Sequence, residues 1–386
     1  MPIERFHIHV SDDILDDLKY RLHHIRWPDQ VENAEWEQGT ELSYLKSLVS
    51  YWKDHYDWRA QESKLNRLSQ FRCNIYGIDV HFVHERGKGP NPLPIILTHG
   101  WPDSYLRYQK IIPLLTDPAS YGGSPEDSFD VIVPSLPGFG FSSPPKQPGV
   151  NNYHVSEMWA KLMTEELGYK RFAAAGGDIG SGVTRYLASN HPELVFGIHL
   201  TDIGIIRNLL TSSDQANLSE DELQYKKNAS EWIAQEGGYM SLQSTRPQSL
   251  AYGLSDSPAG LAGWIIEKYR AWSDCNGNLQ NRFNKDELIT HIMIYWVTNT
   301  FGSSARMYYE NSHSLPPLDY IEVPTAVALF PADILLPPKE WAARNLNIVR
   351  WTSFPSGGHF TAMEEPELLA QDIRAFYKSF RMNNNH

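Results

Sequence analysis

The sequence predicts an α/β protein: a mostly parallel sheet covered by helices on both faces, with a helical insertion and a helical N-terminal extension. Three observations predict it. Between residues 92 and 204, short apolar runs alternate with helical segments, which is typical of a parallel sheet buried on both faces. Residues 205–318 interrupt the alternation with mostly helical, polar and aromatic sequence, and the alternation then returns. The first ~90 residues carry a separate helical pattern.

Residues 1–90 are expected to form the extension, as helices followed by an edge hairpin. The segment "SDDILDDLKYRLHHIRWPD" begins with Ser11 as a helix cap, has apolar residues at helical spacing, and must end before Pro28. The segment "TELSYLKSLVSYWKDHYDW" predicts a second amphipathic helix. The alternating run "FRCNIYGIDVHFVHERG" turns at Gly77 and predicts a hairpin at the edge of the sheet.

The α/β core is expected over residues 91–204 and 319–386, and the insertion over 205–318 forms a helical cap. The predicted strands lie in "PLPIILTHGWP", "FDVIVPSLPGFGFS", "RFAAAGGD", "LVFGIHLTD", "IEVPTAVALFPAD" and "NIVRWTSFPSGGHF". The predicted helices between them lie in "SEMWAKLMTEELG", which stops at Gly168, in "SGVTRYLASNHP" and in "PELLAQDIRAFYKSF".

Composition excludes several classes of function. The 386 residues carry 34 basic and 46 acidic side chains, a net charge of −12 with no basic stripe, so nucleic acid is not an expected partner. Cys73 and Cys275 are the only cysteines, which excludes a disulfide framework and a thiolate metal site and favours the reducing cytoplasm. The polar N-terminus predicts no signal peptide, and without an apolar run of 18 residues we expect no membrane span. We expect no cofactor and no metal, and a homodimer is compatible with the sequence.

The stretch "GGDIG" (176–180) has the outline of the nucleophile elbow G-x-S-x-G, with Asp178 in place of serine. It lies between a predicted strand and a predicted helix, where an elbow belongs. Its glycines suit a strained turn that bulkier residues would obstruct. The alternative is that Asp178 only caps the following helix.

The order of residues along the chain favours the elbow. A hydrolase elbow requires a nucleophile, then an acid, then a histidine. Asp178 is followed by Asp333 in "LFPADI" and by His359 in "PSGGHF", each after a predicted strand. Because strand-end loops are where triad partners lie, these three residues are the predicted triad rather than scattered surface residues.

A carboxylate nucleophile suits a strained or activated sp3 carbon, and its attack would give an alkyl ester of Asp178. His359 could then activate water against the carbonyl of that ester, with Asp333 orienting the imidazole. The oxyanion formed on the aspartyl group needs backbone N–H donors. Ile179, directly after the nucleophile, supplies one, and Trp101 in the "HGWPDS" loop is the candidate for the other.

The motifs "HGWPDS", "PGFGFS", "GGDIGS", "FPADI" and "GGHFTAMEEPELLAQDIRAF" resemble those of epoxide hydrolases of the α/β-hydrolase superfamily. The resemblance is to the microsomal-type branch with its N-terminal extension, here including "RLHHIRWPDQ", and runs along nearly the whole chain. It implies an α/β-hydrolase fold, an epoxide and water as the small-molecule substrates, and a vicinal diol as product. The membrane-bound relatives carry an N-terminal anchor that this sequence lacks, so it is similar to the soluble members.

The resemblance also implies two cap tyrosines that hold the epoxide oxygen. Their positions here are Tyr239 in "GGYMSLQSTRP" and Tyr308 in "SSARMYYEN", with Tyr309 adjacent to the second. Ring opening leaves an alkoxide, and a phenol with a pKa of roughly 10 can hydrogen-bond the epoxide and then protonate that oxygen.

Other activities on this fold fit less well. A haloalkane dehalogenase needs donors for a departing halide, often a Trp after the nucleophile, where this chain has Ile179. An esterase would have a serine in the elbow, and a binding protein without activity would have lost one of these positions. A biosynthetic epoxide-opening enzyme or cyclase of the same chemistry stays open, because the motifs do not separate it from broad detoxification.

Overall fold

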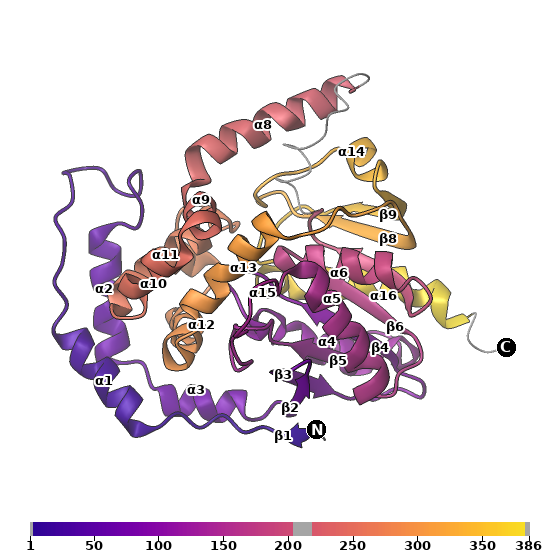
Figure 1. Ribbon diagram of the computed structural model, residues 1–386, viewed down its shortest axis with the longest axis horizontal. Coiled ribbons are helices and arrows are strands. Elements are labelled where there is room, and N and C mark those ends of the chain that lie inside the picture. Colours follow the sequence, from indigo (N-terminus) through magenta and orange to yellow (C-terminus); the bar gives the residue numbers. More distant parts are fainter. Residues whose placement is uncertain (1–2, 204–217, 383–386) are drawn as a thin grey trace.

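The computed structural model describes residues 3–203 and 218–382, and its centre is a single nine-stranded sheet (Figure 1). The strands are β1 (Glu4–Arg5), β2 (Gln70–Ile75), β3 (Ile78–Glu85), β4 (Leu93–Thr98), β5 (Phe129–Pro134), β6 (Phe172–Gly176), β7 (Val195–Leu200), β8 (Ile321–Leu329) and β9 (Leu346–Ser353). Their order is β1-β2-β3-β5-β4-β6-β7-β8-β9. The pairs from β5 to β9 are parallel, and β1, β2 and β3 add antiparallel strands at one edge. The mostly parallel sheet confirms the predicted fold class.

Helices cover both faces of the sheet because its central strands are apolar on both sides. Strands β5, β6 and β7 are buried along their whole length. Helices α5 (Asn152–Lys161) and α6 (Ile179–Asn190) pack together on one face, and α4 (Ile111–Thr116) and α16 (Pro366–Met382) pack together on the other. This arrangement brings the carboxyl ends of the parallel strands to one edge, where α/β sheets bind ligands.

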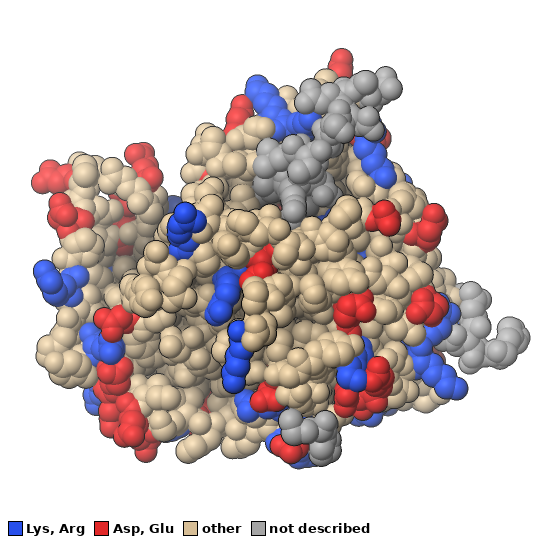
Figure 2. Space-filling view, in the orientation of Figure 1, with Lys and Arg blue, Asp and Glu red and all other residues tan. Residues whose placement is uncertain are grey.

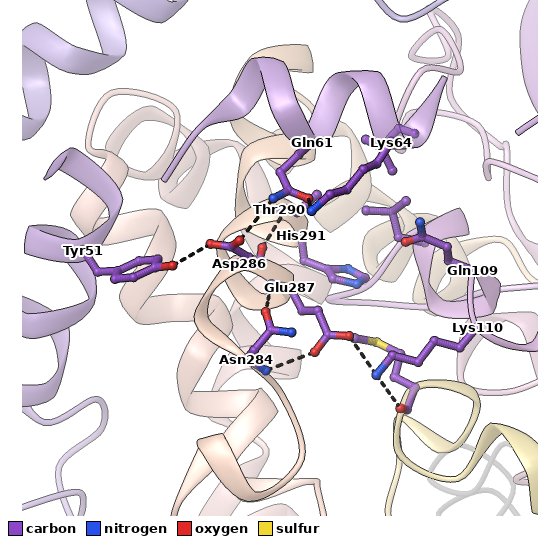
Figure 3. A pocket seen from close by; sticks show the side chains of 13 residues that line it. Tyr51, Gln61, Lys64, Gln109, Lys110, Asn284, Asp286, Glu287, Thr290 and His291 are labelled. Atoms are coloured by element: carbon purple, nitrogen blue, oxygen red, sulfur yellow. Dashed lines mark hydrogen bonds and ion pairs between the residues drawn. The ribbon is translucent and has the colours of Figure 1, made fainter. Parts of the chain in front are cut away.

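The extension wraps along the insertion and ends in the predicted hairpin (Figure 1). Its helices are α1 (Asp12–His23), α2 (Leu42–Asp54) and α3 (Trp58–Leu65). Ser11 occupies the N-cap position of α1, but its side chain makes no capping hydrogen bond within the described residues, so its predicted role as a cap was wrong in that respect. Figure 3 shows how the extension is attached: the Tyr51 hydroxyl donates to Asp286 at 2.9 Å, and Gln61 donates to the same carboxylate at 3.2 Å.

The insertion between β7 and β8 is helical, as expected. Its described helices are α8 (Glu220–Glu236), α9 (Gly238–Thr245), α10 (Pro247–Leu254), α11 (Pro258–Ala271), α12 (Lys285–Thr298) and α13 (Phe301–His313). The expected boundary at residues 204 and 205 lies outside the described residues. The segment "DELITHIMIYWVTNTFGSSARMYYE" forms two helices, because Asn299 takes a left-handed conformation with φ 51° and ends α12.

The described residues also form several short helical turns. They are η1 (Tyr105–Tyr108), η2 (Pro118–Tyr121), η3 (Pro125–Asp127), η4 (Leu162–Glu166), η5 (Leu279–Asn281), α14 (Lys339–Ala343) and α15 (Thr361–Glu364). Acidic and basic side chains are interspersed over the face drawn in Figure 2. Across residues 3–203 and 218–382, none of the helices combines the length and the apolar character that a bilayer crossing requires.

Candidate active site

Asp178 lies on a sharp turn between the end of β6 and the start of α6, as the elbow motif predicts. Its φ of 57° and ψ of −128° are uncommon for a residue with a side chain, and such strain is frequent at functional sites. The turn requires glycine at Gly180, where a Cβ would meet the Thr98 carbonyl oxygen at 1.9 Å. Asp178 occupies the N-cap position of α6, yet its carboxylate accepts a hydrogen bond from another loop. The elbow interpretation therefore describes this residue better than helix capping alone.

The two oxygens of Asp178 have different surroundings. Oδ1 accepts the backbone N–H of Trp101 at 2.8 Å, and the N–H of Ile179 also hydrogen-bonds the carboxylate. Trp101 follows β4, the strand next to β6, and Gly100 before it leaves room for the carboxylate, since a Cβ there would lie 2.2 Å from Oδ1. Oδ2 faces His359, whose Nε2 lies 3.4 Å away. One oxygen is thus held by N–H donors, and the other faces a base.

Asp333 contacts the side of the His359 imidazole that faces away from Asp178. The Nδ1 atom of His359 lies 2.7 Å from Asp333 Oδ1, and both side chains are buried. The loops that carry them are joined by a parallel bridge between Ala332 and Gly358. Asp178, His359 and Asp333 therefore form a continuous chain of contacts across the strand ends, with His359 between the two carboxylates.

The backbone of His359 is fixed by Trp272 and Arg107, which the sequence motifs did not single out. Its N–H donates to the Trp272 carbonyl oxygen at 2.8 Å, which links it to the helical insertion. Its carbonyl oxygen accepts a hydrogen bond from the buried guanidinium of Arg107. Arg107 in turn pairs with Asp103 at 2.5 Å, and Asp103 belongs to the "HGWPDS" motif. The role of Arg107 and Asp103 could not be recognised from the sequence, because it shows only in the burial of this charged pair.

The pKa values of His359 and Asp178 are shifted in opposite directions. Burial alone would lower the pKa of His359, but the charge of Asp333 and the neighbouring Asp178 outweigh it and raise the pKa to about 10. Burial alone would raise the pKa of Asp178, but His359 and the N–H groups of Trp101 and Ile179 lower it below its ordinary value. The resting site is therefore an imidazolium held between two carboxylates.

Tyr239 and Tyr308 come together over Trp101. Tyr239 on α9 stacks on the Trp101 ring with centroids 5.3 Å apart, and Tyr308 on α13 packs edge-on against the same ring at 5.8 Å. The two phenol rings are 5.9 Å apart, and their hydroxyls hydrogen-bond each other. Tyr309 instead is 36% exposed and stacks on His313. The structure therefore brings Tyr308, and not its neighbour, to the site.

Burial raises the pKa of both Tyr239 and Tyr308 above the ordinary value, and the negative charge of Asp178 adds to the effect. Both phenols therefore keep their protons at neutral pH. In the described part of the chain, no group of three or more His, Cys, Asp or Glu side chains is arranged to hold a metal ion.

One acidic residue near the triad was missed from the sequence. Asp202 follows β7, between the strands that lead to Asp178 and Asp333, and accepts a hydrogen bond from the Asp178 backbone N–H. The available signal was its place at the end of the predicted strand "LVFGIHLTD".

Comparison with known proteins gives a consistent result. Residues 3–108 match the family model described as epoxide hydrolase N terminus, and residues 94–236 match that of the alpha/beta hydrolase fold. The epoxide hydrolase 1 of Oryctolagus cuniculus is 36% identical over 403 residues, covering 97% of this chain and 88% of the relative. The juvenile hormone epoxide hydrolase of Bombyx mori superposes with a TM-score of 0.85 at 30% identity, covering 99% of this chain and 95% of that structure. The Aspergillus niger epoxide hydrolase superposes with a TM-score of 0.85 at 28% identity, covering 98% and 97%.

Proposed function

The chain belongs to the epoxide hydrolase family, and we propose that its addition of water to an epoxide, which gives a vicinal diol, runs through an ester on Asp178. The observation that carries this proposal is the division of labour between the two Asp178 oxygens. Oδ1 is held by the N–H of Trp101 at 2.8 Å, while Oδ2 is 3.4 Å from His359. Oδ2 can attack an epoxide carbon, and Oδ1 then becomes the carbonyl oxygen of the ester, already hydrogen-bonded where an oxyanion must form.

The first step opens the ring. Asp178 Oδ2 forms a bond to one epoxide carbon as the bond from that carbon to the epoxide oxygen breaks, and the oxygen takes a proton from the hydrogen-bonded pair Tyr239 and Tyr308. Their raised pKa values keep the phenols protonated until the more basic alkoxide develops. The products are the hydroxyalkyl ester and a phenolate.

The second step hydrolyses the ester. Alkylation removes the negative charge of Asp178, so the pKa of His359 falls and the imidazolium can return its proton to the phenolate. Neutral His359 then takes a proton from water as the water oxygen bonds to the ester carbonyl carbon, and the oxyanion on Oδ1 is stabilised by Trp101 and Ile179. Expulsion of the alkoxide and its protonation by the new carboxyl group release the diol and restore the Asp178 carboxylate and the His359 imidazolium.

Helices α8–α13 are proposed to act as a cap over a core made of residues 91–204 and 319–386. This division is supported by the contacts of Tyr239 and Tyr308 with Trp101, which put insertion residues against core residues at the reacting centre. The reducing cytoplasm is proposed as the compartment, because Cys73 and Cys275 are unpaired and buried in the described chain. A homodimer stays a prediction.

The haloalkane dehalogenase alternative is disfavoured by the family relationship and by Ile179, which offers a backbone donor only. The triad and the tyrosine pair suit a broad hydrolase and a biosynthetic epoxide-opening enzyme equally well. A panel of aryl, alkyl and terpenoid epoxides, with chiral analysis of the diols, separates them: turnover of several simple epoxides supports the broad enzyme, and turnover of one complex epoxide supports the biosynthetic enzyme.

The ester on Asp178 is tested with His359→Gln and styrene oxide. The variant keeps the nucleophile and both N–H donors but lacks the base, so the alkyl group should remain on the peptide that contains Asp178. Mass spectrometry of the digested protein after acid quench detects the mass of one epoxide on that residue. Asp178→Asn is the control that should carry no adduct. Normal steady turnover by His359→Gln, or an adduct elsewhere, would contradict the proposal.

A further inference from the structure

Three neighbouring strands each lead to a carboxylate at the same edge of the sheet. β6 leads to Asp178, β7 to Asp202 and β8 to Asp333, and β7 lies between the other two. Asp202 is 7% exposed. The proposed reaction uses Asp178 and Asp333 but gives no role to Asp202. Because a buried carboxylate is costly unless it is compensated, Asp202 requires an explanation.

Asp202 is attached directly to the nucleophile elbow. The backbone N–H of Asp178 donates to Asp202 Oδ2, and the Ser181 hydroxyl, one turn into α6, donates to the Asp202 carbonyl oxygen at 2.7 Å. Asp178 has the positive φ that makes this turn strained, so its N–H must be held in an unusual direction. A charged acceptor makes the stronger hydrogen bond here.

Several charged groups surround Asp202. Burial and the charge of Asp333 raise the pKa of Asp202 to about 6, His359 opposes the rise, and Asp178 adds to it. Other titratable groups whose charges interact with Asp202 include Arg185 on α6, Tyr225 on α8 and Tyr108 in η1. Above pH 6, Asp202 therefore places a second negative charge beside Asp178. That repulsion raises the free energy of the Asp178 anion and disappears when Asp178 becomes a neutral ester.

We propose that Asp202 is a positioning residue for the nucleophile, whose carboxylate holds the Asp178 backbone and whose negative charge favours conversion of the Asp178 anion into the ester. The effect falls on ring opening, the step in which Asp178 loses its charge. This inference rests on the proposed function of Asp178.

Two substitutions separate the two contributions. Asp202→Asn keeps an oxygen that can accept the Asp178 N–H but removes the charge, and Asp202→Ala removes both. Single turnovers with excess enzyme and styrene oxide, quenched in acid at increasing times, give separate rate constants for formation and loss of the ester on the Asp178 peptide. The matched control is Asp130→Asn, which neutralises a buried carboxylate at the amino-terminal end of β5, the opposite edge of the sheet.

The expected loss in ester formation is about tenfold for Asp202→Asn, which loses only the charge, and on the order of a hundredfold for Asp202→Ala, which also leaves an N–H unpaired. Ester hydrolysis should change less than formation in both variants, and Asp130→Asn should change neither. Between pH 5 and 8, wild-type ester formation should rise through about pH 6 with a limb that Asp202→Asn lacks.

Unchanged ester formation in both variants overturns the inference, as does an equal loss in both steps, which would indicate a structural role only. These outcomes are distinct from failure of the proposed function. If the wild-type protein forms no ester on Asp178, the nucleophile assignment fails. If the wild-type ester forms and the Asp202 variants form it at the same rate, only the role of Asp202 fails.

Discussion

Asp178→Asn imitates the charge change that alkylation brings, because it neutralises the carboxylate while keeping its size. The His359 Nε2 atom is 3.4 Å from Asp178 Oδ2. At an effective dielectric constant of about 20, that separation corresponds to about 5 kcal/mol of attraction for the imidazolium, or roughly 3.5 in pKa. Asp333 remains at 2.7 Å and keeps its share of the stabilisation. We therefore expect the pKa of His359 to fall from about 10 by at least about two when Asp178 is neutral.

The assay is an NMR titration of the histidine ring signals in protein labelled at the imidazole Cε1 position. The chain has 15 histidines, and the His359→Gln spectrum identifies the signal that belongs to His359. In the wild-type protein that signal should stay in the imidazolium position from pH 6 to 8.5, and in Asp178→Asn it should titrate within or near that range. Glu157→Gln is the matched control, because it neutralises a carboxylate that lies 3.0 Å from another histidine, His191, and the His359 signal should titrate as in the wild-type protein.

A wild-type His359 that titrates near 6.5 would show that the two carboxylates do not stabilise the imidazolium. An Asp178→Asn protein whose His359 keeps the wild-type pKa would show that alkylation cannot turn the imidazolium into a base. Either result would refute the proton path proposed for the second step.

Three other outcomes are expected. Tyr239→Phe and Tyr308→Phe should each slow ester formation about tenfold, and the double variant a hundredfold or more, because each phenol can replace the other as proton donor. Single-turnover quench experiments measure the rate of ester formation. Variants that slow ester hydrolysis instead would contradict the role of the two phenols. Asp333→Asn should slow ester hydrolysis by roughly a thousandfold or more, because an amide cannot hold the imidazole as the carboxylate does. The ester should then accumulate in steady turnover. If no ester accumulates, the role of Asp333 in orienting His359 is contradicted. The raised pKa of Asp202 means that the wild-type protein loses stability as the pH rises from about 4 to about 6. Urea unfolding should therefore show that Asp202→Asn is more stable than the wild-type protein by about 3 kcal/mol above pH 6. Equal stability of the two proteins at pH 8 would contradict this expectation.

The core of the fold could be predicted because its strands are continuous apolar runs and its helices are not. The run "RFAAAGGD" is buried along the whole of β6, as a central parallel strand requires. The break between α12 and α13 could not be predicted, since it depends on a single left-handed residue, Asn299, inside a long helical pattern. Helix α3 was not predicted, because the expected second helix ends at Trp58, where α3 begins.

The triad residues were predicted from their order along the chain and from the glycines around Asp178, which are signals that the sequence itself carries. Tyr308 was assigned by the register of a resemblance, and the structure supplies the physical reason: Tyr308 lies one turn after the buried Ser304, on the inward face of α13, while Tyr309 points away. Asp202 and the raised pKa of His359 could not be found this way. Both depend on which strands are neighbours and on distances between residues far apart in the sequence.

The path of oxygen through the reaction tests the central claim most directly. A single turnover with excess enzyme in oxygen-18 water should give a first diol without label, because its new oxygen comes from Asp178, and the label should appear in the Asp178 carboxylate of the digested protein. Oxygen-18 in the first diol, with none in Asp178, would show that water attacks the epoxide directly and would contradict the ester mechanism.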